Sequence, residues 1–130
     1  MKQCWTHLEI DAPAEALWEL LTDVESWPGW GPTVQRAVLQ GAELEDGATG
    51  TVTTILGVQL GFEITDYQEG LRWSWRVAGV PATGHMVESI GADRCRVSFG
   101  VAWPALPYLA VCQVALRRLD KLAQQTRAGS

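Results

Sequence analysis

The chain has 130 residues, of which 47% are hydrophobic and 19% charged, and its formal net charge at pH 7 is -5. This length and balance predict a single globular domain over residues 1–130 rather than a disordered or repetitive chain. Because affinity for nucleic acid rests on clustered Lys and Arg, the acidic charge excludes nucleic acid from the expected partners.

The cysteines and the apolar segments indicate where the protein is located and whether it holds a metal or a disulfide. Cys4, Cys95 and Cys112 form no Cys-x-x-Cys pair, so neither a disulfide framework nor a zinc site is expected. The longest apolar stretch, residues 103–116, contains Pro104 and Pro107 and is too short for a membrane span. Residues 1–5 lack the apolar stretch of a secretory signal. We therefore expect a cytoplasmic protein with no membrane span, no metal and no other cofactor.

The first part of the chain predicts a strand and two short helices. Residues 4–10 alternate between two faces, as a strand with one buried face does. Pro13 fits a first helical turn, and the leucines that follow recur at helical spacing to about Thr22. A further helical turn begins at the capping residue Asp23 and is broken by Pro28.

The rest of the chain predicts six more strands and one long helix. Strand patterns cover residues 33–40, 51–56, 58–65, 71–77, 84–90 and 95–103. The acidic, glycine-punctuated segment 41–50 is expected to be an exposed, mobile loop. From Leu109 to about Thr126, apolar residues recur at helical spacing. Because short turns join consecutive strands, we expect a seven-stranded antiparallel sheet that curls around the last helix.

Residues 10–30, which read IDAPAEALWELLTDVESWPGW, resemble the opening of the START-like, or SRPBCC, superfamily. Trp73 and Trp75 on the fifth predicted strand, His85 on the sixth and a final helix that starts at a proline are similar to its polyketide cyclase/dehydrase-like branch. The resemblance covers nearly the whole chain. It implies an α+β helix-grip fold, with a deep cavity for lipids, sterols, plant hormones, polyketides or other hydrophobic ligands. It implies no single reaction, since some members fold and dehydrate a polyketide chain and others only bind or carry a ligand.

The alternation of the strands suggests which residues line such a cavity. The candidate ligand-binding residues are Leu60, Phe62, Trp73, Trp75, Val87, Phe99, Val101, Trp103, Leu109 and Cys112. A mostly apolar lining suits a hydrophobic or aromatic small molecule. Each of these residues could instead fill a core, but seven tryptophans are hard to pack without gaps and favour a ring-shaped ligand. Trp18, Trp27 and Trp30 are assigned to packing.

Two residues are candidates for catalysis. His85 has the strand parity of Val87 and could face the pocket, where an imidazole with a pKa near neutrality would transfer protons. The alternative is an edge or core histidine that holds a hydrogen bond. Tyr108 is a candidate hydrogen-bond donor to a ligand carbonyl.

Two functions remain open from the sequence. The first is binding of an apolar or aromatic molecule, polyketide or lipid-like, with or without cofactor-free cyclisation or dehydration of a polyketide. The second is a protein-interaction or regulatory module whose cavity has collapsed. In the first case the partner is a hydrophobic small molecule, and the chain is expected to be a monomer or a homodimer.

Overall fold

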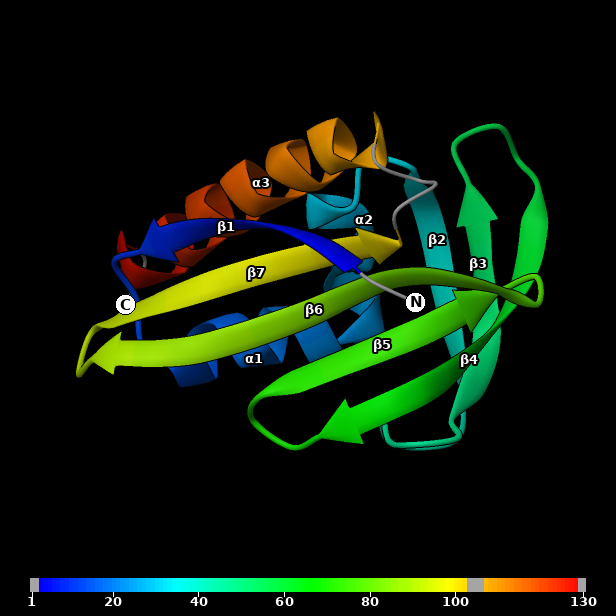
Figure 1. Ribbon diagram of the computed structural model, residues 1–130, viewed down its shortest axis with the longest axis horizontal. Coiled ribbons are helices and arrows are strands. Elements are labelled where there is room, and N and C mark those ends of the chain that lie inside the picture. Colours follow the sequence, from blue (N-terminus) through cyan, green and yellow to red (C-terminus); the bar gives the residue numbers. More distant parts are fainter. Residues whose placement is uncertain (1–2, 103–106, 129–130) are drawn as a thin grey trace.

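The computed structural model describes residues 3–102 and 107–128, and within them one antiparallel sheet of seven strands organises the chain (Figure 1). The strands are β1 (Gln3–Ile10), β2 (Val34–Gln40), β3 (Thr49–Thr54), β4 (Gln59–Gln68), β5 (Arg72–Val77), β6 (Val80–Gly91) and β7 (Arg94–Ala102). Their order in the sheet is β1-β7-β6-β5-β4-β3-β2. Consecutive strands from β2 to β7 are neighbours, and β1 closes the sheet beside β7.

The helices lie on one side of this sheet. After β1 come α1 (Ala14–Thr22), the short 3-10 helix η1 (Val24–Ser26) and α2 (Trp27–Trp30), and α3 (Leu109–Ala128) follows β7. The carboxylate of Asp23 accepts a hydrogen bond from the backbone N–H of Glu25 (3.1 Å) and so caps η1. In Figure 1, α3 runs along β1 and β7 with α2 beneath its N-terminal half. The predicted α+β helix-grip fold, with short helices after the first strand and a long last helix, is confirmed.

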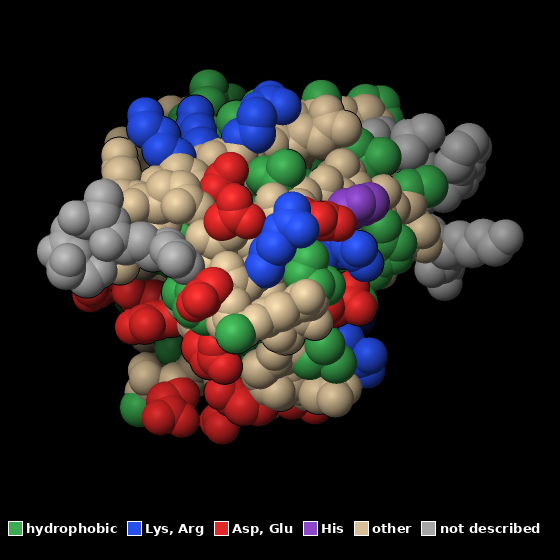
Figure 2. Space-filling view, turned by 90° about the vertical axis from the view of Figure 1, so that its left-hand side faces the viewer, with side chains coloured by type: hydrophobic (Ala, Val, Ile, Leu, Met, Phe, Trp, Pro, Cys, Tyr) green, Lys and Arg blue, Asp and Glu red, His purple; other side chains and the backbone are tan. Residues whose placement is uncertain are grey.

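Apolar side chains from the sheet and the helices form one core. The most deeply buried, each at most 1% exposed, include Ile10, Leu17, Leu21, Ile64, Trp73, Val97 and Leu119. Charged side chains lie outside, and Figure 2 shows several acidic and basic ones on the end of the molecule that is on the left in Figure 1. There Arg94 pairs with Glu9 (3.2 Å) and Asp11 (3.0 Å) and links the start of β7 to the end of β1.

The acidic segment 41–50 is better anchored than the sequence suggests. Its acidic side chains are exposed as expected, but Leu44 is only 7% exposed and packs into the core. Two backbone hydrogen bonds also join the end of this segment to Ile64 on β4. The N–H of Gly47 donates to the carbonyl of Ile64 (2.9 Å), and the N–H of Ile64 donates to the carbonyl of Ala48 (2.8 Å). One apolar side chain and a continuation of the β-ladder therefore tie this loop to β4.

Gly50 on β3 leaves the least room for a side chain among the described glycines. A Cβ at this position would stand 2.3 Å from the carbonyl oxygen of Val38 and 2.6 Å from the ring of Phe62. We expect Gly50→Ala to lower the free energy of unfolding by about 1–3 kcal/mol, because backbone and a buried ring must shift. Urea denaturation measures the loss. Gly61→Ala is the matched control, since a Cβ there meets only the Gly50 carbonyl at 4.0 Å, and an equal loss in both variants would contradict the steric explanation.

Candidate ligand-binding site

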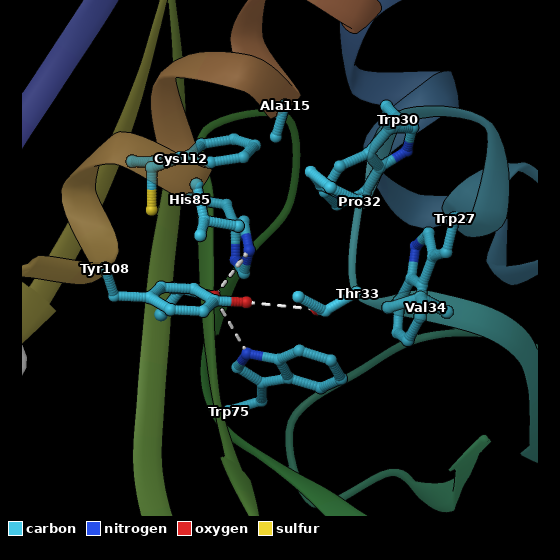
Figure 3. A pocket seen from close by; sticks show the side chains of 14 residues that line it. Trp27, Trp30, Pro32, Thr33, Val34, Trp75, His85, Tyr108, Cys112 and Ala115 are labelled. Carbon is cyan, nitrogen blue, oxygen red and sulfur yellow. Dashed lines mark hydrogen bonds between the residues drawn. The ribbon is translucent and has the colours of Figure 1, made fainter. Parts of the chain in front are cut away.

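Two adjoining cavities open between the sheet, α2 and the beginning of α3. The helix-side cavity has a volume of about 50 Å³, and its walls include Trp27, Trp30, Val111, Cys112 and Ala115 from the two helices (Figure 3). The strand-side cavity has a volume of about 300 Å³, and its walls include Val52, Thr53, Leu60, Val77 and Val101 from the strands. Both cavities share the residues Thr33, Val34, Trp75, Thr83 and Tyr108. These shared side chains are the boundary between the two spaces.

The structure brings together part of the candidate set. Among the candidate residues, those that line one or both cavities are Leu60, Trp75, His85, Phe99, Val101, Tyr108 and Cys112. Phe62, Trp73 and Val87 lie in the core, at most 4% exposed, and line neither cavity. Leu109 is half-buried and also lines neither. Trp103 lies outside the described residues.

Other residues that line the cavities were not singled out from the sequence for this role. Trp27 and Trp30, assigned to packing, are indeed buried, but they also form one wall of the helix-side cavity. Thr83 lies on β6 two residues before His85, and its strand parity was a signal that could have placed it on the same face. Thr33 and Val34, at the start of β2, carried no such signal.

Hydrogen bonds to α1 fix the two tryptophans of α2. The indole N–H of Trp27 donates to the carbonyl of Leu21 (2.9 Å), and that of Trp30 donates to the carbonyl of Leu20 (3.0 Å). Both acceptors lie near the end of α1. Since the polar edges of the two indoles are satisfied there, the rings offer apolar surface to the cavity.

Aromatic rings pack closely around these tryptophans. Trp27 stacks on Trp73 at 5.3 Å between ring centres and meets Trp75 edge-on at 5.2 Å. Trp30 meets Phe99 edge-on at 5.6 Å. Trp73 and Trp75 therefore both reach Trp27, but Trp73 is completely buried while Trp75 is half-buried at the cavity wall.

A chain of hydrogen bonds crosses the polar part of the wall. The indole N–H of Trp75 donates to the hydroxyl oxygen of Thr83 (3.0 Å), which lies 3.0 Å from Nε2 of His85. Nδ1 of His85 lies 3.2 Å from the carbonyl oxygen of Trp73. A carbonyl can only accept, so Nδ1 carries the proton, and Nε2 of the neutral ring accepts from the Thr83 hydroxyl. Each ring nitrogen of His85 thus has a partner within the protein.

Burial keeps His85 neutral. The side chain is only 2% exposed. Removal from water lowers the pKa of His85 to about 3, although the hydrogen bond to the Trp73 carbonyl opposes the shift. The expected pKa near neutrality is therefore wrong, and the reason is burial in the aromatic core. With Nε2 engaged by Thr83, the imidazole is a hydrogen-bonding support within the wall.

Two hydroxyls and a thiol complete the polar groups of the shared boundary and the helix-side wall. The hydroxyls of Tyr108 and Thr33 lie 3.1 Å apart, and Figure 3 shows them pointing toward one another across the cavity. Burial raises the pKa of the Cys112 thiol to about 11, so it stays protonated at neutral pH. The hydroxyl pair is the most accessible polar group of this set, because Tyr108 is 38% exposed.

Over residues 3–102 and 107–128, no cluster of three or more His, Cys, Asp or Glu side chains is placed to hold a metal ion. In the same part of the chain, no helix combines the length and the apolar character that crossing a membrane would require.

Comparisons with known proteins show which family the chain belongs to. Residues 6–124 match the family described as polyketide cyclase / dehydrase and lipid transport. A search of curated proteins finds no match. The fold is similar to that of XoxI from Bacillus cereus, with a TM-score of 0.75 and 14% identity over 98% of this chain and 99% of that one.

Two further solved structures have the same fold. A protein from Thermobifida fusca has a TM-score of 0.73 and 20% identity, over 96% of this chain and 95% of that one. The di-domain ARO/CYC BexL from the BE-7585A biosynthetic pathway has a TM-score of 0.73 and 15% identity over 93% of this chain, which covers 46% of BexL. At such identities the structures support the fold alone. Since the family match spans nearly the whole chain, this protein belongs to the polyketide cyclase / dehydrase and lipid transport family, within the START-like, or SRPBCC, superfamily.

Proposed function

We propose that this chain binds an apolar or aromatic small molecule, of polyketide or lipid-like character, in the two adjoining cavities. The observation that carries the proposal is an open space walled by the rings of Trp27, Trp30 and Trp75, in which Trp75 is hydrogen-bonded to Thr83 and Tyr108 to Thr33. Aromatic and aliphatic walls with a few placed polar groups are typical of small-molecule sites. The family description, which names cyclases, dehydrases and lipid transport, supports the same class of ligand.

The alternative of an interaction module requires a collapsed cavity. The tryptophans do not fill this interior, because spaces of about 50 Å³ and 300 Å³ remain beside them. We therefore favour a ligand over a protein partner as the occupant of this site.

Cofactor-free cyclisation or dehydration of a polyketide is a second candidate. The Tyr108 and Thr33 hydroxyls favour it, because they lie where the two cavities meet and could hydrogen-bond a carbonyl of a chain held across both. In this proposal Tyr108 contacts the substrate, and His85 acts only through Thr83. Incubation of a poly-β-ketone chain with the protein would show loss of water by mass spectrometry, and an unchanged chain would contradict the reaction while leaving binding intact.

The binding proposal predicts a strong effect at Trp75, which lines both cavities. We expect Trp75→Ala to weaken binding of methyl naphthyl ketone at least about tenfold, because an aromatic wall of the site is removed. Fluorescence quenching gives the affinity, and native mass spectrometry of the purified protein shows any small molecule that copurifies.

Trp5→Ala is the matched control for this measurement. The Trp5 ring lies over Gly100, where a Cβ would stand 2.8 Å from it, and it contributes to neither cavity. Its removal should leave affinity unchanged. Equal losses in the two variants, or no binding of this ketone and a broad panel of apolar ligands, would contradict the proposed function.

A further inference from the structure

We propose that the site selects uncharged ligands that carry a hydrogen-bonding oxygen, and that it rejects carboxylates of the same shape. This inference rests on the proposed function and specifies its ligand class. It follows from the absence of charged side chains among the described lining residues, from the hydrogen bonds within the wall, and from the hydroxyl pair at the boundary of the two cavities.

The walls carry no charged side chain. Apart from Trp75, the described lining residues come from four stretches, 26–35, 47–62, 77–87 and 97–116, and none of these contains Asp, Glu, Lys or Arg. Arg76, the neighbour of Trp75 on β5, points to the exposed surface and lies 3.5 Å from Glu63. A ligand in these cavities therefore meets no counter-charge from the residues that line them.

The rim continues the uncharged surface. The turn between β3 and β4 presents Ile55 at 62% exposure and Leu56 at 86%, and the start of β6 presents Val80 at 63%. In Figure 1 both turns lie at the end of the molecule opposite the one that faces the viewer in Figure 2. A charged ligand that approaches the strand-side cavity thus passes an apolar rim.

The buried polar atoms of the wall are already paired. Trp75 donates to Thr83, Thr83 donates to Nε2 of His85, and Nδ1 of His85 donates to the carbonyl of Trp73. This chain ends on a backbone carbonyl and has no N–H left over. Protonation of His85 would place a charge on a side chain that is only 2% exposed, in a wall whose lining residues are uncharged. His85 is therefore built into the wall as a neutral group.

The hydroxyls of Tyr108 and Thr33 lie where a ligand held across both cavities would meet them. Whichever of them donates in their shared hydrogen bond, the other keeps its own proton, so the pair offers one O–H and several lone pairs. That is a match for a ketone, a phenol or an alcohol. One neutral hydroxyl cannot offset the loss of hydration of a carboxylate, whose burial needs a paired charge.

This arrangement predicts how affinity depends on pH. A carboxylic acid with a pKa near 4 is neutral in only about one molecule in a thousand at neutral pH, and the neutral form is the one that fits. Its affinity should therefore fall about tenfold for each pH unit above its pKa. A ketone of the same shape has no such dependence.

The test compares methyl naphthyl ketone with naphthoic acid by fluorescence titration at about pH 6, 7 and 8. We expect a constant Kd for the ketone, a Kd at least about 100-fold higher for the acid at neutral pH, and a tenfold rise for the acid per pH unit. Leu60→Lys places a cation in the wall of the strand-side cavity, because Leu60 lines it and pairs with the buried Val52. It should improve binding of the acid at least about tenfold and flatten its pH dependence. Thr65→Lys, on the exposed part of β4 and outside both cavities, makes the same charge change and should do neither.

The outcomes separate the two proposals. If the wild-type chain binds the acid as tightly as the ketone at neutral pH, or if Thr65→Lys improves acid binding as much as Leu60→Lys, charge selection in the cavity is refuted while the proposed function stands. If neither the ketone nor any neutral member of a broad panel binds, the proposed function fails and this inference fails with it.

Discussion

Trp73→Ala is expected to lower the free energy of unfolding by about 3–5 kcal/mol. Trp73 is fully buried, and its ring lies between two others, 5.3 Å from the ring centre of Trp27 and 3.9 Å from that of His85. Removal of the indole leaves a large cavity, which the surrounding rigid rings cannot fill. Equilibrium denaturation in urea, followed by circular dichroism, measures the change without relying on tryptophan emission.

Trp73→Phe provides the sharper comparison. The Nε1–H of Trp73 is buried and has no hydrogen-bond partner among the described residues, so the indole carries a desolvation cost that phenylalanine lacks. We expect Trp73→Phe to be at least about 1 kcal/mol less destabilising than Trp73→Ala. Trp5, 44% exposed on the outer face, is the reference, and Trp5→Ala should cost least. A Trp73→Ala loss no larger than that of Trp5→Ala would show that this stack is not a principal part of the core.

The fold could be predicted from strand periodicity, because successive residues of a strand point to opposite faces and the pattern can be found within each segment. The main misplaced boundary is the start of β6, expected at residue 84 and found at Val80. Ala78 and Gly79 both have positive φ (52° and 77°) and form the hairpin turn themselves, so Val80 already pairs with Val77. A turn through Ala78 is unexpected from sequence, since a residue with a Cβ rarely adopts this conformation.

The site was predicted less completely, for a different physical reason. Alternation shows which face of a strand a residue occupies, but not whether a helix covers it. Trp73 and Trp75 have the same parity, yet one is completely buried under Trp27 and the other reaches the cavity. The position of α2 over the sheet decides this, and it follows from the hydrogen bonds of Trp27 and Trp30 to the end of α1.

Acid is expected to destabilise the protein through His85. In the folded protein burial lowers the pKa of His85 to about 3, whereas an unfolded chain has the ordinary value of about 6.5. As the pH falls, the unfolded state therefore binds the proton first, and stability decreases between about pH 6.5 and pH 3. Above that window both states are neutral at this residue and it contributes no pH dependence. The expected loss is about 2 kcal/mol at about pH 5, measured from urea denaturation curves across the pH range.

His85→Gln separates this contribution from that of the carboxylates. A glutamine amide can still accept from Thr83, which lies 3.0 Å from Nε2 of His85, but it does not titrate. The variant should be less stable at neutral pH, because it packs less well on Trp73, yet its stability should change little between about pH 7 and pH 5. The two curves should thus converge as the pH falls. If they run parallel, another group causes the acid sensitivity, and the neutral state of His85 in the wall of the site loses its thermodynamic support.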